Sequence, residues 1–312
     1  MSSKCTEALH QLLVVVLDIN PHQLLFARQS GSFSQVLNSV MSLLSQHMML
    51  HPTNQVTKCL CEYFLFIFHA QVALVASHSS GCTFLYPDKT QEDSELVLRQ
   101  QDGQYEMFYH LETVIKEKVV QVMEKDKGVH NNECLLSGAL TQALCYVNKV
   151  QSSRHESEKF SPRLLVMSST GDTAAQYINF MNVFFTAQKM NIPVDCCMLL
   201  QDSGLLQQGS DITGGLYIKV EQLSGLLQYL TWMFLPGPSV RAMLGAPPSV
   251  KVDYRAACFC HRQLVDVGFV CSVCLSIFCS FNPICTTCRS VFKAPGLPPS
   301  KKKKITDNSI KK

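Results

Sequence analysis

The stretch that decides the fold is Leu12-Leu-Val-Val-Val-Leu17, a run of apolar residues followed at once by Asp18. Such a run without polar interruption is typical of a central strand that is covered on both faces, as in a parallel sheet. An amphipathic helix is predicted next. Its apolar residues recur at mostly three- and four-residue spacings, at Phe33, Val36, Leu37, Val40, Leu44 and Met48.

The same alternation of short apolar runs and helical stripes continues along most of the chain. Further strands are expected at 72–76, 81–86 (a short edge strand), 163–167, 194–199 and 216–220. Further helices are expected at 108–122, 135–147, 174–189, 205–213 and 222–234. This order predicts an α/β domain with a doubly wound, mostly parallel sheet and right-handed crossovers.

Two clusters of proline and glycine divide the C-terminal part of the chain. The first comprises Pro236-Gly-Pro238 and Gly245-Ala-Pro-Pro248, and the second is Pro295-Gly-Leu-Pro-Pro299. Such clusters mark linkers and breaks between structured segments. We therefore expect four parts: an α/β domain at 1–235, a linker at 236–254, a cysteine-rich module at 255–293 and a basic tail at 294–312.

Charge is distributed unevenly, although the formal net charge is only +3. Residues 1–250 carry −5, residues 251–293 carry +3 and residues 301–312 carry +5. Because phosphate binding needs clustered lysine and arginine, direct contact with nucleic acid is expected only in the C-terminal part. Charged residues make up 16% of the chain, below the roughly 25% of an average soluble domain, which favours a subunit whose surface faces partners.

Seven of the fifteen cysteines cluster between residues 258 and 288, which indicates a reducing compartment with a metal site rather than a disulfide framework. Two pairs share one spacing, Cys271-Ser-Val-Cys274 and Cys285-Thr-Thr-Cys288. Each Cys-x-x-Cys turn brings two thiolates to one side, and two such turns supply the four tetrahedral ligands of a zinc ion. We predict a structural zinc bound by Cys271, Cys274, Cys285 and Cys288, with no open position for catalysis.

A second group of ligand types remains in the same segment: Cys258, Cys260, His261 and Cys279. Its Cys-x-Cys-His spacing differs from that of the first group, and Cys279 stands alone in the sequence. The residues therefore leave open a single zinc site or a RING-like double site.

The loop after the first strand is the expected ligand position in an open α/β sheet, and it has the sequence Asp18-Ile-Asn-Pro-His22. The strand followed by Asp18, the long helix and the late turn at 211–217 resemble the von Willebrand factor A family. Many members of that family bind Mg²⁺ through an Asp-x-Ser-x-Ser loop, a Thr before a central helix and an Asp after the fourth strand.

The family's metal ligands are largely replaced here. Asn20 and His22 stand at the serine positions, Cys134 falls near the threonine and Ser169 near the second aspartate. Mg²⁺ wants a near-octahedral set of oxygens with a well-placed carboxylate. We therefore expect a degenerate loop, Asp18, Asn20 and His22, without a bound metal.

Two longer stretches resemble one family more specifically. The first is Tyr177-Ile-Asn-Phe-Met-Asn-Val-Phe-Phe-Thr-Ala-Gln-Lys189 with 202–208, and the second is Val252-Asp-Tyr-Arg-Ala-Ala-Cys-Phe-Cys-His-Arg262 with 271–279. They are similar to the family of subunit 3 of general transcription factor IIH (TFIIH), a von Willebrand A domain followed by a four-cysteine zinc finger. The resemblance covers nearly the whole chain in order and spacing.

This resemblance implies a non-enzymatic core subunit in the nucleus that binds the RING-bearing subunit 2. The complex opens promoters for RNA polymerase II and opens DNA around lesions in nucleotide excision repair. The lysine run 301–304 suits either nuclear import or a solvated tail. Base stacking by this tail is not expected, because the last twenty positions hold no aromatic residue.

Residues 56–71 depart from the family pattern, in which residue 55 would join residue 72 directly. With 72–76 they form a hydrophobic stretch of about membrane-spanning length, but no span is predicted because polar residues interrupt it at Glu62, His69 and Gln71. We hypothesise a retained intron, since valine codons begin with GT, glutamine can be encoded by CAG, and the phenylalanine-rich end suits a pyrimidine tract. If the segment is part of the protein, we expect an exposed hydrophobic loop that either contacts a partner or promotes aggregation.

Two other function classes are alternatives to this scaffold. A RING-like ubiquitin ligase is suggested by the dense cysteines, and a metal-dependent adhesion domain by the von Willebrand A pattern, although the degenerate loop opposes the latter. No catalytic residue is predicted, because the sequence contains no Gly-x-Ser-x-Gly elbow, no phosphate-binding glycine loop with lysine and no His-Glu-x-x-His helix.

Overall fold

The chain forms two compact units, Met1–Tyr254 and Arg255–Lys312. The computed structural model describes residues 10–20, 31–50, 72–87, 104–126, 135–153, 160–172, 176–199, 201–245, 251–261 and 263–292. The inserted segment 56–71 and the basic tail 294–312 lie outside these residues.

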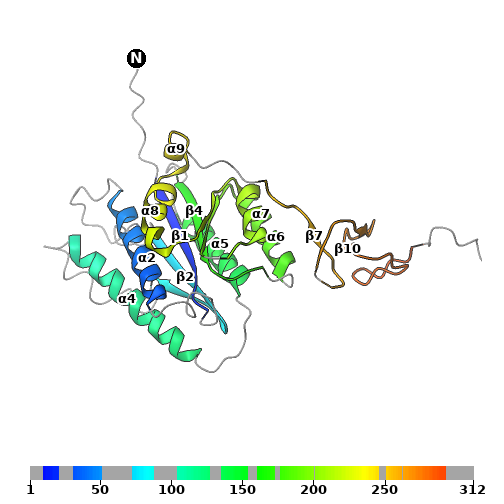
Figure 1. Ribbon diagram of the computed structural model, residues 1–312, viewed down its shortest axis with the longest axis horizontal. Coiled ribbons are helices and arrows are strands. Elements are labelled where there is room, and N and C mark those ends of the chain that lie inside the picture. Colours follow the sequence, from blue (N-terminus) through cyan, green and yellow to red (C-terminus); the bar gives the residue numbers. More distant parts are fainter. Residues whose placement is uncertain are drawn as a thin grey trace, which may run out of the picture. The chain divides into compact units, whose positions relative to one another are not determined.

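A six-stranded sheet forms the centre of the larger unit (Figure 1). Its strands are β1 (His10–Asp18), β2 (Val72–His78), β3 (Gly81–Tyr86), β4 (Phe160–Ser168), β5 (Val194–Leu199) and β6 (Tyr217–Val220). Their order is β3-β2-β1-β4-β5-β6, and all neighbours are parallel except the antiparallel pair β2 and β3. The predicted doubly wound, mostly parallel sheet is confirmed, with 81–86 as its antiparallel edge strand.

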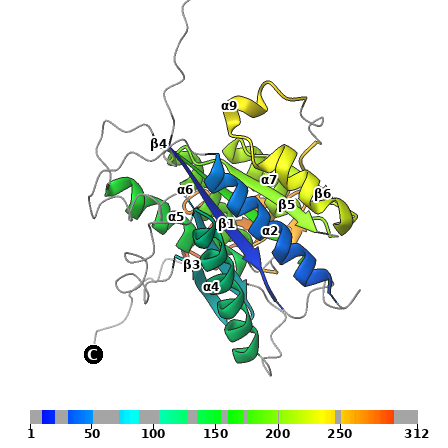
Figure 2. The same ribbon diagram turned by 90° about the vertical axis from the view of Figure 1, so that its left-hand side faces the viewer.

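Helices cover both faces of this sheet. They are α2 (Ser32–Met49), α4 (Gln104–Lys125), α5 (Leu136–Ser152), α6 (Tyr177–Lys189), α7 (Gly204–Thr213) and α8 (Leu226–Tyr229), and the short α9 (Pro238–Arg241) comes after them in the chain. Figure 1 shows α2, α4 and α8 on one face and α5, α6 and α7 on the other, and Figure 2 looks onto the face with α2 and α4. Among the described residues, no helix is long and apolar enough to cross a membrane.

Strand β1 joins the two helical layers. One set of its side chains packs in the layer of α2 and α4: Leu13, Val15 and Leu17. The alternate set packs in the layer of α5 and α6: Leu12, Val14 and Val16. All six are at most 1% exposed, and burial of each such side chain contributes roughly 1.5–3 kcal/mol. The apolar run at 12–17 therefore contributes to the core of both layers.

The segment predicted as one helix over 222–234 is helical but changes type along its length. It consists of a 3₁₀ turn at Leu223–Gly225, then α8, then a π-helical turn at Leu230–Phe234. The N–H of Leu235 donates to the carbonyl of Leu230 at 2.9 Å, five residues earlier. Widened turns of this kind present backbone carbonyls to other partners.

A buried arginine meets the carbonyls at this helix end. Arg163, 2% exposed, donates from Nη1 to the carbonyls of Phe234 at 2.7 Å and Pro236 at 2.8 Å, and from Nη2 to that of Leu235 at 2.6 Å. Burial lowers the pKa of Arg163 to about 10, so it stays charged at neutral pH. A cation is favourable here because the C-terminal carbonyls of a helix carry partial negative charge.

Parts of the expected linker are bonded to the α/β domain. Arg241 in α9 donates to both carboxylate oxygens of Asp195, at 2.7 and 2.5 Å, and Asp195 is 1% exposed. Near the other end of the segment, the side-chain amide of Gln208 donates to the carbonyl of Asp253. Two segments of 236–254 are thus held by the domain.

The smaller unit contains two short antiparallel ribbons. They pair β7 (Ala256–Ala257) with β8 (Leu264–Val265), and β9 (Phe269–Val270) with β10 (Ile277–Phe278). Its apolar cluster has three buried members in the described residues, Cys271, Phe278 and Cys285. Two of these three are cysteines, so ordinary apolar burial alone gives this unit little stability.

Candidate metal centre

The carboxyl edge of the sheet holds the first group of possible ligands. Asp18, 2% exposed, accepts hydrogen bonds at Oδ2 from the hydroxyls of Ser168 and Thr170, both at 2.8 Å. Its Oδ1 accepts the N–H of Asn20 at 3.2 Å. Ser169 is also buried at this edge. The two remaining positions of the predicted loop set, His22 and Cys134, lie outside the described residues.

A second carboxylate at this edge is also engaged. Asp172 accepts the hydroxyl of Ser203 and, at 3.1 Å, the N–H of Leu205, so it caps the start of α7. For Mg²⁺ to bind, these carboxylates would have to exchange the hydrogen bonds from hydroxyl and backbone N–H groups for the ion, which prefers a near-octahedral set of oxygens. The described residues of this edge therefore fit a set of hydrogen-bonded caps better than a cation site.

Sequence reasoning did not single out Ser168, Thr170 or Asp172. The available signal was a run of polar residues directly after the strand predicted at 163–167, where the carboxyl end of a parallel strand meets the ligand edge. Their partners come from loops distant in sequence, which the sequence alone does not pair.

The cysteine-rich unit brings together the four predicted zinc ligands. The ligand atoms of Cys271, Cys274, Cys285 and Cys288 all lie within 4.8 Å of one another. The Sγ atoms of Cys271 and Cys288 are 3.6 Å apart, as are those of Cys274 and Cys285. A tetrahedral ion with metal–sulfur bonds of about 2.3 Å requires sulfur–sulfur separations of about 3.8 Å. The four thiols are therefore spaced to hold a metal ion.

Two serines contact this group from the same relative position. The hydroxyl of Ser276 lies 3.1 Å from Sγ of Cys274, and that of Ser290 lies 3.1 Å from Sγ of Cys288. The hydrogen bond from Ser276 lowers the pKa of Cys274 to about 6, and the one from Ser290 lowers the pKa of Cys288. Both contacts favour the thiolate, which is the form that binds metal.

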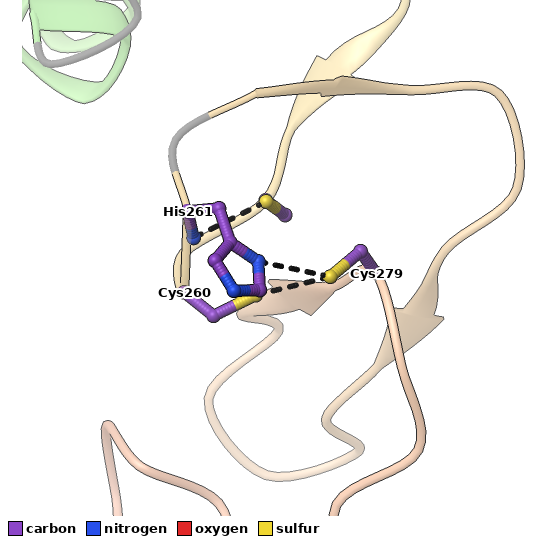
Figure 3. Close-up of side chains that lie close together, drawn as sticks. Cys260, His261 and Cys279 are labelled. Carbon is purple, nitrogen blue, oxygen red and sulfur yellow. Dashed lines mark hydrogen bonds between the residues drawn. The ribbon is translucent and has the colours of Figure 1, made fainter.

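The second group also comes together, as Figure 3 shows for three of its members. Sγ of Cys279 lies 3.3 Å from Sγ of Cys260 and 3.2 Å from Nδ1 of His261. Cys258 completes the set, and all four ligand atoms lie within 4.8 Å of one another. A backbone hydrogen bond from Gln263 is the main cause that lowers the pKa of Cys258 to about 6. These residues are likewise arranged to hold a metal ion.

Cys279 stands alone in the sequence, and the β9–β10 ribbon explains its place in the second group. Strand β10 ends at Phe278, and the carbonyl of Ile277 in that strand accepts the N–H of Phe259 at 2.8 Å. This contact places Cys279 beside the turn that carries Cys260. The spacing of ligands in the sequence could not show this pairing, because it depends on contacts between ribbons.

The two groups alternate along the chain. Cys258, Cys260 and His261 belong to one group, Cys271 and Cys274 to the other, Cys279 to the first again, and Cys285 and Cys288 to the second. Each group therefore joins two segments that the other group separates in sequence. Both sets use protein side chains at all four positions, an arrangement typical of structural rather than catalytic metal.

Comparison with known proteins gives matches over most of the chain. The family model "Transcription factor Tfb4" matches residues 10–289. General transcription and DNA repair factor IIH subunit tfb4 of Schizosaccharomyces pombe is 37% identical over 93% of this chain and 91% of that relative. The corresponding TFB4 subunit of Arabidopsis thaliana is 36% identical over 90% of this chain and 88% of that relative.

The larger unit also matches a solved structure, the crystal structure of the TFIIH p34 N-terminal domain. The identity is 26% and the TM-score 0.56, with 73% of this chain and 99% of that chain covered. The larger unit therefore shares the doubly wound α/β fold of that domain.

Proposed function

The chain belongs to the transcription factor Tfb4 family, and on this premise we propose that it is a non-enzymatic scaffold subunit of the TFIIH core. The observation that carries the proposal is the family match from residue 10 to residue 289, which includes both compact units. Under this proposal the chain acts in the nucleus, in transcription initiation by RNA polymerase II and in nucleotide excision repair.

The geometry of the sheet edge supports the expectation that the loop after β1 binds no cation. The carboxylates of Asp18 and Asp172 are both held by hydroxyl and amide donors of the domain itself. Millimolar Mg²⁺ should therefore leave the melting temperature of the domain unchanged relative to EDTA. A rise of several degrees with Mg²⁺ would show a working cation site and contradict the expectation of a loop without metal.

The partner we propose for the scaffold is subunit 2, the RING-bearing subunit. Large exposed apolar side chains support a protein partner: Trp232, the single tryptophan of the chain, is 67% exposed, and Met243 is 80% exposed. The low charged fraction of the whole chain points the same way.

Co-purification tests this assignment directly. The native chain should leave nuclear extract in a large complex that contains subunit 2, and the two purified subunits should bind each other without the rest. A monomer in the extract would contradict the scaffold role. If the chain leaves the extract in a complex but purified subunit 2 does not bind it, the direct contact is with another subunit.

We propose that both ligand groups bind zinc, a soft-ligand metal suited to four closed positions. The first site uses Cys271, Cys274, Cys285 and Cys288, and the second uses Cys258, Cys260, His261 and Cys279. Metal analysis of the purified full chain should find two zinc ions per chain. One zinc ion per chain would eliminate the second site.

A RING-like ubiquitin ligase is the second candidate, because alternation of two metal groups along a chain is the pattern of a cross-braced module. The discharge of a charged ubiquitin-conjugating enzyme distinguishes the two functions. Ubiquitin release stimulated by the chain would favour the ligase, and unchanged release would favour the scaffold.

We also propose that the chain has four functional parts. They are a domain at 1–235, a linker at 236–254, a zinc module at 255–293 and a basic tail at 294–312. The boundary of the compact units between Tyr254 and Arg255 supports the start of the module. Limited proteolysis of the full chain should separate the larger unit from the cysteine-rich unit before it cuts within either of them.

A further inference from the structure

Three turns of the cysteine-rich unit repeat one backbone arrangement. They begin at Cys258, Cys271 and Cys285. In each turn the N–H of the residue three positions later points to the Sγ of that cysteine, at 3.4, 3.5 and 3.5 Å respectively. In each, the cysteine's own N–H donates to the carbonyl five positions later, at 2.9 Å in all three. The turns can therefore be compared position by position.

The turns differ at two linked positions. The residue three positions after the first cysteine is His261 in the first turn and a cysteine, Cys274 or Cys288, in the other two. The residue five positions after it is Gln263 in the first turn and a serine, at Ser276 or Ser290, in the other two. Serine thus occurs where the ligand is a thiol, and it is missing where the ligand is an imidazole.

Each of the two serines places its hydroxyl on the sulfur two residues before it, at 3.1 Å. Ser276 is 2% exposed, and a hydroxyl buried to that extent needs a hydrogen-bond partner. The same distance recurs in two turns fourteen residues apart. Gln263 is exposed and has no such role in the first turn.

The physical reason lies in the charge of the ligands. Four thiolates around one Zn²⁺ carry a surplus of negative charge, and Cys271 and Cys285 of this set are 3% and 1% exposed. Donors to a charged acceptor form strong hydrogen bonds, and such outer contacts hold metal ligands in place. A neutral imidazole brings no charge to a site, so the turn with His261 does not need the donor.

We infer that Ser276 and Ser290 are positioning residues of the four-cysteine site, whose hydroxyls hold the thiolates of Cys274 and Cys288 and strengthen zinc binding there. This inference rests on the proposed zinc site. The two hydroxyls contact Cys274 and Cys288, which both belong to the four-cysteine site. The effect on zinc binding is therefore expected at this site and not at the group that contains His261.

Substitution at the half-buried Ser290 tests the inference with little loss of packing. In the full-length chain, Ser290→Ala should weaken zinc binding at one of the two sites by about tenfold in a chelator competition, and Ser290→Thr, which keeps the hydroxyl, should restore it. Ser276→Ala combined with Ser290→Ala should weaken it further. Ser272→Ala, an exposed serine within the same turn as Cys274, is the matched control and should match the wild type.

Cobalt(II) in place of zinc allows the wavelength of the sulfur-to-cobalt charge-transfer band to be measured. A loss of folding would abolish this band rather than shift it. Without the hydroxyl donors the thiolates are better electron donors, so the sulfur-to-cobalt charge-transfer band should move to longer wavelength in Ser290→Ala. The band should return in Ser290→Thr. An unchanged band and unchanged zinc affinity in the double variant would overturn the inference while leaving the zinc site intact. Failure of the wild type to bind zinc or cobalt would instead overturn the proposed zinc site itself.

Discussion

The sheet edge around Asp18 and the cysteine-rich unit both bring possible metal ligands together, but the ligand atoms have different partners in the two regions. Asp18 has hydroxyl and amide donors from its own domain on both carboxylate oxygens. The thiols of the other unit mostly face one another, with sulfur–sulfur distances of 3.3 to 3.6 Å. Close thiolates repel each other unless a cation lies between them.

The two regions also differ in what surrounds their ligands. The sheet edge is built on β1, whose side chains from residue 12 to residue 17 are almost fully buried between two helical layers. The apolar cluster of the smaller unit has three buried members in the described residues, two of them cysteines. A large core can position ligands without metal, whereas a small unit depends on the metal for its folding.

The largest expected effect is the loss of the smaller unit's fold on substitution of one ligand. Cys274→Ser or Cys285→Ser should lower the zinc content by one ion or more per chain and unfold residues 255–292, because metal binding supplies much of the folding free energy of so small a unit. Metal analysis measures the loss of zinc, and proteolysis at these residues measures the unfolding. The far-UV circular dichroism signal of the larger unit should persist.

The matched control is Cys145→Ser, which removes an exposed thiol on α5 and should change neither zinc content nor proteolysis. A Cys274→Ser chain that kept the smaller unit folded without metal would break the comparison between the two regions.

The next effect concerns the buried ion pair of the larger unit. Arg241→Met should cost about 3–5 kcal/mol of unfolding free energy, because the buried carboxylate of Asp195 would lose both hydrogen bonds from Arg241 and keep the one from the N–H of Leu216. Urea denaturation followed by circular dichroism measures it. Lys219→Met is the control, since its pair with Asp202 is long, at 3.8 Å, and exposed, and its loss should cost at most about 1 kcal/mol. Equal costs for both variants would show that burial does not govern these pairs.

A smaller effect should appear at acid pH through Asp126, which follows α4 and is 3% exposed. Burial favours its neutral form, but hydrogen bonds from Ser80 and Ser79 and the charge of His78 outweigh burial and hold the pKa of Asp126 below its usual value. A depressed folded pKa contributes stability that is fully present above the unfolded pKa of about 3.9 and is lost as pH falls through the folded pKa.

Asp126→Asn should therefore be about 1–3 kcal/mol less stable than the wild type at pH 7, and the difference should shrink below about pH 4. Urea denaturation at several pH values measures it. Glu124→Gln, which changes an exposed carboxyl two residues earlier in α4, should show no such pH dependence. A difference between Asp126→Asn and the wild type that is constant with pH would contradict the charge argument.

The smallest effect is expected from deletion of residues 56–71. Helix α2 ends at Met49 and β2 begins at Val72, so the deletion leaves the connection 50–55, within the usual length for such loops. The melting temperature should change by no more than a few degrees, and the deleted chain should be more soluble. Unfolding on deletion would show that the segment contributes to the domain, and its presence in the predominant mature transcript would refute the retained intron.

Much of the fold could be predicted because hydrophobic pattern is a local property. The run at 12–17 and the stripe at 33–48 correspond to β1 and α2, and strand 194–199 matches β5 at both ends. The irregular helix end at 230–234 could not be predicted, since it faces the guanidinium of Arg163, which is distant in sequence. Ser168 and Thr170 were missed for the same reason.

The sequence by itself determined the α/β alternation, the two Cys-x-x-Cys pairs and the family. Each of these depends on residue spacings over short segments or on similarity along the chain. Only the tertiary structure decided that Cys279 joins Cys258, Cys260 and His261, and that the carboxylate of Asp18 is held by Ser168 and Thr170. The physical reason is that these contacts arise when separate turns and strand ends are brought together by packing. Their geometry depends on the whole fold rather than on any one segment.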